Sequence, residues 1–196
     1  MNEMLQQEDF WDNKWSNNQT GWDIGYASPA IVDYFEKYDQ KDAKILIPGC
    51  GNAHEALALL ALGYRNITLL DIATTAVEHL KNKFQNSENI SIIKGDFFQH
   101  QEQYDIIIEQ TFFCAIPTNW RENYVTQAYN LLRENGKIVG LLFNTEFEKQ
   151  GPPFGGNTSE YMELFQNKFD VNIMETCYNS IAPRSGKELF VNLTKK

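Results

Sequence analysis

A glycine-containing turn and an acidic residue in this sequence have the types and spacing of a nucleotide-binding site. Gly49 and Gly51 separate a short apolar run from a stretch rich in Ala and Leu, and Asp71 ends the next apolar run. A glycine turn before a helix, with an acid about 20 positions further on, lets a carboxylate accept hydrogen bonds from ribose hydroxyls. The turn lacks the third glycine of a dinucleotide site, so we expect another ligand; a strand, turn and helix without any ligand is the alternative.

Two further acids stand where the following apolar runs end. Asp96 comes shortly after one run, and Glu109 ends the next. Because ligands of open parallel sheets bind at the carboxyl ends of the strands, both acids would share one edge with Asp71. Asp96 could accept a hydrogen bond from the exocyclic amine of adenine while Phe97 packs on the base. Each acid alone could be a solvated loop residue, but their register with the strands favours a nucleoside ligand.

The elements that must position these residues alternate between strands and helices. Short apolar runs predict five successive strands at 45–47, 67–70, 90–94, 104–109 and 137–143. The first run is continuously apolar, as in a parallel sheet that is covered on both faces. Segments 171–178 and 189–193 predict an antiparallel pair at the sheet edge. The predicted fold class is therefore α/β, with a mostly parallel seven-stranded sheet, an antiparallel C-terminal strand and helices on both faces.

Helix ends are predicted from capping residues. Thr74 or Thr75 would cap the helix that follows Asp71, and Thr158 would cap a short helix near the C-terminus. Gly136 would end the helix that precedes the fifth strand.

The N-terminal segment carries three of the four tryptophans. Trp11 and Trp15 are spaced to share one face of a helix, and Trp22 follows in a polar, Gly-containing loop. An aromatic segment of this kind could fold over a ligand, exclude water and place a ring beside a cationic centre. The alternative is that the rings only close one side of the core. We expect residues 1–196 to form a single domain, with 1–40 as a helical and aromatic lid.

The composition limits the class of protein. A net charge of -9 argues against a nucleic-acid partner, because phosphate binding needs clustered Lys and Arg. No run of apolar residues is long enough to cross a membrane, and the acidic, polar N-terminus differs from a signal peptide. The three cysteines lack metal-ligand spacing, so we expect reduced thiols and no metal. These features predict a cytoplasmic protein, and we expect a monomer that acts on a small molecule.

An ordered set of motifs runs from Phe10 to Phe154, with a fainter match in I-A-P-R-S-G. The motifs are F-W-x-x-x-W, T-G-W-D, P-G-C-G, G-D-F-F, T-F-F-C-A-I-P-x-x-x-R-x-x-Y and G-P-P-F. This set resembles the class I S-adenosylmethionine-dependent methyltransferases. More narrowly, it is similar to the thiopurine S-methyltransferase superfamily and its thiol and halide methyltransferase branch. The resemblance implies a Rossmann-like fold and the cofactor S-adenosylmethionine, with S-adenosylhomocysteine as product.

The resemblance also implies roles for individual residues. The cofactor would be bound by Trp11, Trp15, Trp22, Gly49, Gly51, Asp71, Ile72, Asp96, Phe97 and Glu109. The acceptor pocket would be lined by Phe113, Cys114, Phe154 and Tyr161, with Arg121 as the candidate catalytic residue that positions the acceptor. Glu109-Gln110 departs from the aspartate-led sequence usual in the halide branch, which leaves the acceptor open.

The implied reaction is in-line transfer of a methyl group from a sulfonium to a small soft nucleophile, such as a thiol, a thiopurine-like compound or a halide. Such acceptors need little base catalysis, so positioning and desolvation would supply most of the acceleration. Arg121 could favour an anionic acceptor, or it could be a surface arginine at a helix N-terminus. The alternatives are an O- or N-methyltransferase, an NAD-binding oxidoreductase and a non-catalytic cofactor-binding module.

Overall fold

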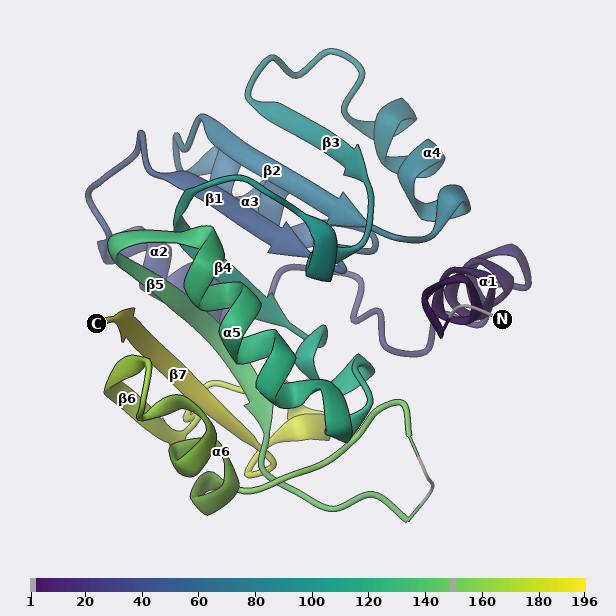
Figure 1. Ribbon diagram of the computed structural model, residues 1–196. Coiled ribbons are helices and arrows are strands. Elements are labelled where there is room, and N and C mark those ends of the chain that lie inside the picture. Colours follow the sequence, from purple (N-terminus) through teal and green to yellow (C-terminus); the bar gives the residue numbers. More distant parts are fainter. Residues whose placement is uncertain (1–2, 149–150) are drawn as a thin grey trace.

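The computed structural model describes residues 3–148 and 151–196. One sheet of seven strands has the order β3-β2-β1-β4-β5-β7-β6 (Figure 1). The strands are β1 (Lys44–Pro48), β2 (Asn66–Asp71), β3 (Ile90–Lys94), β4 (Tyr104–Gln110), β5 (Leu132–Phe143), β6 (Phe169–Thr176) and β7 (Glu188–Lys195). The α-helices are α1 (Glu3–Ser16), α2 (Pro29–Lys37), α3 (His54–Ala61), α4 (Thr74–Lys83), α5 (Arg121–Leu131) and α6 (Thr158–Phe165).

The connections place a crevice at the centre of the sheet. The chain runs outward from β1 to β2 and β3, then crosses back to β4 on the other side of β1. Strands β1 to β5 pair in parallel, whereas β7 is antiparallel to both β5 and β6. Ligands of such sheets bind where the direction of winding reverses, which here is the carboxyl end of β1 and β4. The α/β fold class with its antiparallel C-terminal strand is confirmed.

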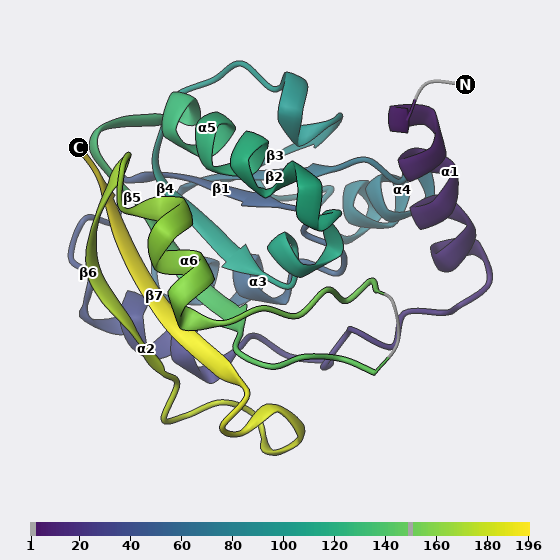
Figure 2. The same ribbon diagram turned by 60° about the horizontal axis from the view of Figure 1, so that its bottom comes forward.

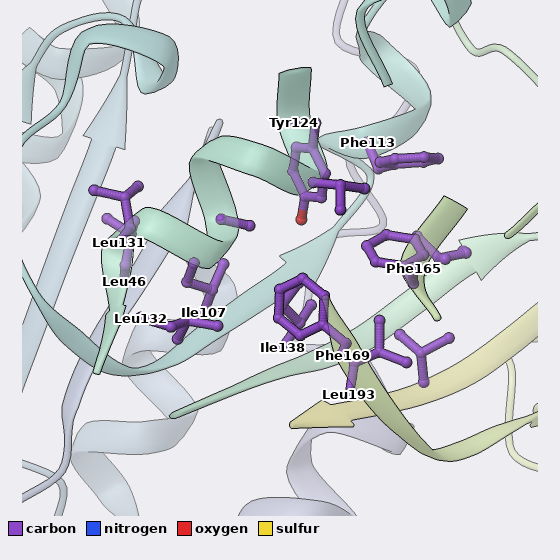
Figure 3. Packing of buried hydrophobic residues seen from close by; sticks show 14 of the residues in the cluster. Leu46, Ile107, Phe113, Tyr124, Leu131, Leu132, Ile138, Phe165, Phe169 and Leu193 are labelled. Carbon is purple, nitrogen blue, oxygen red and sulfur yellow. The ribbon is translucent and has the colours of Figure 1, made fainter. Parts of the chain in front are cut away.

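Alternating side chains of the strands build a core on each face. In β1, Leu46 packs into the layer beneath α5 and α6, whereas Ile45 and Ile47 pack toward α2, α3 and α4. Figure 3 shows the first layer, where Tyr124 of α5 and Phe165 of α6 lie over side chains of the central strands. Burying a large apolar side chain stabilises a fold by about 1.5–3 kcal/mol, so both layers fix the sheet edge firmly.

The helices divide between the two faces as predicted. Figures 1 and 2 show α5 and α6 on one face of the sheet, and α2 and α3 on the other. The first helix, α1, lies outside this arrangement, next to α4. Within the expected lid of residues 1–40, α2 packs against the sheet through the buried Ile31 and Phe35. We use the name lid for residues 3–28, and their closure over a ligand stays a prediction.

Three predicted helix ends differ from the structure, and the cause is different in each case. Asn157, not Thr158, caps α6 by accepting a hydrogen bond from the amide of Glu160 at 3.0 Å. Strand β5 begins at Leu132, where it pairs with β4, so α5 ends before Gly136 is reached. The third case, α4, is capped by the lid and is described below. Among the described residues, no helix combines the length and the apolar character needed to cross a membrane.

Candidate functional site

A cavity of about 730 Å³ opens at the carboxyl ends of the parallel strands. This volume lies within the range of small-molecule sites. One end of the cavity is formed by the turn after β1, the ends of β2 and β3 and the lid, and we call it the cofactor end. The other end is formed by described residues at 111–117, 143–147, 151–153 and 183–187, and we call it the acceptor end.

The glycine turn supplies space as well as a tight bend. Gly49 and Gly51 both have positive φ, +54° and +51°, in the left-handed region that favours glycine. A side chain at Gly49 would overlap the ring of Phe112, which also lines the cavity. The absence of a side chain at Gly49 therefore lets Phe112 pack against the turn, and the close approach of a ligand stays a prediction.

Asp71 is held in place by backbone amides at the end of β2. Its two carboxylate oxygens accept hydrogen bonds from the amides of Gly51 and Ala73, each at 3.0 Å. Burial raises the pKa of Asp71, and these amides partly oppose the rise. A carboxylate has about four acceptor positions, so each oxygen can still accept a hydrogen bond from the cavity. Asp71 and its neighbour Ile72 both line the cavity.

The end of β3 contributes an acid and an aromatic ring. Asp96 accepts a hydrogen bond from the amide of Phe98 at 3.1 Å, which opens the 3-10 turn Phe97–Gln99. Burial raises the pKa of Asp96, against the effect of that amide. The ring of Phe97 is stacked on Tyr124, with centroids 5.3 Å apart. Both Asp96 and Phe97 line the cavity, so the structure brings together the residues predicted for the nucleoside.

The three tryptophans of the N-terminal segment cover the cofactor end. Trp11 and Trp22 meet edge to face with centroids 5.3 Å apart, and Trp15 lies 6.3 Å from Trp22. All three line the cavity. The lid is fastened to α4, since Asp12 accepts a hydrogen bond from the amide of Thr75 at 2.7 Å. Asp12 thus supplies the cap that the sequence assigned to Thr74 or Thr75.

A second fastening holds the loop that carries Trp22. Asp23 accepts a hydrogen bond from the side chain of Asn52 and lies 2.8 Å from Nε2 of His54, at the start of α3. Burial alone would raise the pKa of Asp23, but hydrogen bonds from the amide of Gly25, Asn52 and His54 outweigh it, and the pKa is lowered. We call Asp23, Asn52 and His54 the lid latch.

The acceptor end combines apolar rings with two cations. Its lining includes Phe143, Phe147, Pro152, Pro153, Arg184 and Lys187. Arg184 donates to the carbonyl of Trp22 at 3.0 Å and lies 3.3 Å from the buried carboxylate of Glu188. Sequence reasoning missed Arg184 and Lys187 as site residues. The signal was the R-S-G-K sequence between the last two strands, which cannot be placed until the order of those strands is known.

Cys114 is the one predicted acceptor-pocket residue that lines the cavity. Its thiol donates a hydrogen bond to the carbonyl of Thr111 at 3.3 Å. Burial raises the pKa of Cys114 to about 12. The side chain is therefore a neutral thiol near pH 7, which suits a wall of the pocket and not a nucleophile.

Five predicted site residues lie behind the cavity wall: Glu109, Phe113, Arg121, Phe154 and Tyr161. The carboxylate of Glu109 is turned away from the cavity. It accepts hydrogen bonds from the amide of Phe113 at 2.8 Å, the amide of Phe112 at 2.9 Å and the hydroxyl of Tyr124 at 2.8 Å. Burial raises the pKa of Glu109 to about 7. Glu109 therefore holds the 111–117 loop and does not face a ligand.

Arg121 is also directed away from the cavity. Its guanidinium is paired with Glu160 at 2.5 Å and donates to the carbonyl of Gly155 at 2.7 Å. The rings of Phe113 and Tyr161 lie beside it, at 4.8 and 5.6 Å from their centroids. Arg121 begins α5, and its long side chain follows these buried partners. The predicted contact of Arg121, Phe113 and Tyr161 with an acceptor is therefore absent from this arrangement.

The charged groups of the described residues are divided unevenly along the cavity. The lining carboxylates, Asp71 and Asp96, both stand at the cofactor end, where Lys14 of α1 is a lining cation. At the acceptor end the ionisable lining residues are Cys114, Arg184 and Lys187. Within the described part of the chain, this end has two cations and no carboxylate or imidazole to act as a base.

The sequence of this chain is similar to those of known proteins. The family model described as thiopurine S-methyltransferase (TPMT) matches residues 6–194. The chain is similar to thiocyanate methyltransferase 1 of Brassica oleracea, with 32% identity over 93% of this chain and 83% of that protein. It is also similar to a thiopurine S-methyltransferase of Vibrio parahaemolyticus, with 28% identity over 82% of each chain.

Solved structures share the fold at low identity. The 1,6-didemethyltoxoflavin N1-methyltransferase of Burkholderia thailandensis, solved with S-adenosylhomocysteine, has a TM-score of 0.77 and 15% identity over 99% of this chain and 88% of that one. Magnesium protoporphyrin IX methyltransferase of Synechocystis, solved with S-adenosylmethionine, also has a TM-score of 0.77, with 12% identity over 100% of this chain and 98% of that one.

Proposed function

Because this chain belongs to the thiopurine S-methyltransferase family and is an S-adenosylmethionine-dependent methyltransferase, we propose that its acceptor is a small, soft anion, foremost a thiolate. The observation that carries the proposal is the acceptor end of the cavity. It presents apolar rings and two cations, Arg184 and Lys187, and its described lining offers no base.

The cofactor end fits S-adenosylmethionine. The turn at Gly49 and Gly51 has no side chains to obstruct a bound chain, and Asp71 is oriented with free acceptor positions for a ribose. Asp96 would accept from the adenine amine, and Phe97 would pack on the base. When bound, S-adenosylmethionine supplies a methyl group on a positively charged sulfur. The rings of the lid would face that charge and keep water away.

The lining of the acceptor end is evidence for an acceptor that is already deprotonated when it binds. A neutral hydroxyl or ammonium acceptor would have to lose a proton to a nearby base before or during attack. The described lining residues include no carboxylate or imidazole there, and Cys114 holds its own proton. A thiolate or halide needs no such group. Arg184 and Lys187 would attract the anion, and the surrounding rings would strip its water.

The chain would then accelerate the reaction mainly by placement. Fixing two reactants in line can contribute several powers of ten without acid or base catalysis. Arg184 suits this task because it contacts both the lid, through the carbonyl of Trp22, and the acceptor end. The position of the acceptor is thereby linked to the closed position of the lid.

The test is methyl transfer from labelled S-adenosylmethionine to a matched pair of acceptors. A substituted thiophenol and the phenol of the same size and substitution are assayed at a pH where both are ionised. We expect the thiolate to be methylated at least about a hundredfold faster, and hydrosulfide or iodide to react as well. An amine and a neutral alcohol serve as controls. Preferential methylation of the amine or the alcohol would refute the proposal and indicate an O- or N-methyltransferase.

A further inference from the structure

Arg121 lies behind the acceptor end and holds one of the loops that form it. We propose that Arg121 is a positioning residue that clamps the loop Gly151–Gly156 and thereby sets the width of the acceptor end. The cleft would then select acceptors by size through Arg121 and by charge through Arg184 and Lys187. This inference rests on the proposed function, because it assigns a role within the acceptor site.

The hydrogen bonds of Arg121 all lead to the loop or to α6 beside it, and its guanidinium also packs on the ring of Phe113. One terminal nitrogen is 2.5 Å from the carboxylate of Glu160 in α6, and the other donates to the carbonyl of Gly155 at 2.7 Å. A longer contact of 3.5 Å reaches the carbonyl of Phe154. The side chain is only 3% exposed. Nε of Arg121 is buried without a hydrogen-bond partner among the described residues, and Arg121 is not part of the cavity lining.

The loop has an anchored half and a lining half. In the anchored half, the amide of Phe154 donates to the carbonyl of Cys114 at 2.7 Å, and the amide of Gly156 donates to the carbonyl of Thr145 at 3.1 Å. Figure 2 shows this half running beside the segment that follows β5. Gly151, Pro152 and Pro153 form the other half and line the cavity. A shift of the anchored half therefore moves the wall of the acceptor end.

Loss of the clamp should affect large acceptors more than small ones. Phe147 and the two prolines line the acceptor end, so the placement of a large aryl thiolate would depend on where the loop lies. Hydrosulfide occupies little of this space and would be held by the charges of Arg184 and Lys187. A direct contact of Arg121 with the acceptor would have the opposite signature, because both anions would lose the same charge interaction.

The experiment compares KM for an aryl thiolate and for hydrosulfide in Arg121→Met. We expect KM for the aryl thiolate to rise about tenfold or more, because a hydrogen bond to a charged group is lost, while KM for hydrosulfide stays within about twofold. Affinity for S-adenosylhomocysteine, measured by calorimetry, should be unchanged. The matched control is Arg133→Met. Arg133 is an exposed arginine at the start of β5, and it is paired with Asp105. This control should leave both KM values as in the wild type.

A second variant moves the loop without removing a charge. A side chain at Gly155 would overlap the carbonyl oxygen of Thr145, so Gly155→Ala must displace the anchored half. We expect the same selective rise in KM for the aryl thiolate. This variant keeps the inference testable should Arg121→Met fail to fold.

A third measurement does not depend on turnover. Hydrogen exchange should show faster exchange at the amides of Phe154 and Gly156 in Arg121→Met than in the wild type or Arg133→Met. Equal losses for both acceptors, or unchanged exchange in the loop, would overturn the clamp. If the wild type methylates neither anion, the proposed function fails, whereas the clamp is still decided by the exchange rates.

Discussion

The two ends of the cavity are built in different ways. The cofactor end takes its polar groups from the ends of successive parallel strands, and backbone amides fix them, as at Asp71. The acceptor end takes its lining from three connections that are far apart in the sequence, through described residues at 111–117, at 143–147 with 151–153, and at 183–187. Side chains outside the cavity, Glu109 and Arg121, hold two of these connections.

This difference indicates where specificity can change without loss of the common chemistry. The cofactor end depends on the sheet itself, so an alteration there should affect the reaction with every acceptor. The acceptor end depends on loops and their anchors, so an alteration there should redistribute activity among acceptors. The comparison is tested most strongly by variants that should affect one end only.

The largest effect is expected for Asp71→Ala at the cofactor end. It removes the acceptor of two backbone hydrogen bonds and of the predicted bonds from ribose, which together correspond to about 3 kcal/mol. We expect affinity for S-adenosylhomocysteine to fall about a hundredfold by calorimetry. Asp170→Ala, at an exposed position in β6, is the control. An unchanged affinity would remove the ribose assignment.

The next effect concerns Glu109, which lies where the two ends meet. Its pKa rises from 4.5 to about 7 on folding, so the native protein binds the proton more tightly than the unfolded chain does. Its contribution to stability is therefore fully present below pH 4.5 and is lost as the pH rises toward 7. The expected slope is about 1 kcal/mol for each pH unit in this window.

Thermal melts of the wild type and Glu109→Gln across this pH range check the expectation. The glutamine can accept from the same amides but does not ionise, so the variant should lack this part of the pH dependence. Asp71, Asp96 and Glu55 also have a raised pKa, but they contribute equally to both proteins and cancel in the comparison. Parallel curves would mean that Glu109 does not titrate in this range.

A smaller effect is expected for Arg184 at the acceptor end. Removal of Arg184 alone would leave the buried carboxylate of Glu188 unpaired, so Glu188→Gln is compared with the double variant Glu188→Gln/Arg184→Met. The double variant should raise KM for hydrosulfide and for an aryl thiolate about tenfold, through loss of charge. Affinity for S-adenosylhomocysteine should fall less than threefold. If the affinity for S-adenosylhomocysteine fell by a larger factor than KM rose, the distinction between the two ends would be wrong.

The smallest effect is expected at the lid latch. Asp23→Asn keeps one side-chain acceptor but loses the charge that faces His54. Because this pair is partly exposed, it is worth at most about 1 kcal/mol, and affinity for S-adenosylhomocysteine should fall about threefold. Titration of the variant with S-adenosylhomocysteine, beside Asp39→Asn at an exposed position as the control, measures it. A change in acceptor preference without a change in this affinity would place the latch at the other end.

The sequence predicted correctly that Gly49, Asp71 and Asp96 gather at one end of the cavity, because the signals are local, whereas Glu109 lies behind the cavity wall. Glycines, acids and apolar runs within one strand and turn are enough to place Gly49, Asp71 and Asp96 at one edge. The sheet, its helices and the N-terminal aromatic cover follow from the same short-range periodicity. Such signals predict which elements form and which residues lie at the carboxyl ends of the strands.

The remaining features depend on contacts between distant parts of the chain. The cap of α4 comes from Asp12, which lies 63 positions from the amide that it accepts from. Arg121 occupies the predicted place at the start of α5, but a motif does not specify which neighbours a long side chain will reach. Arg184 and Lys187 come to the cavity only because β6 runs to the same edge as the parallel strands, and β7 returns from it.

The position of β7 also has a consequence for biosynthesis. Because β7 lies between β5 and β6, each of these strands has an unpaired edge until residues 188–195 have been synthesised and inserted. Open edges can pair with another chain, so the nascent protein is most exposed to aggregation just before this last insertion. The same insertion delivers Arg184 and Lys187. During synthesis of residues 3–196, the cofactor end can therefore form before Arg184 and Lys187, which are proposed to select the acceptor, reach their positions.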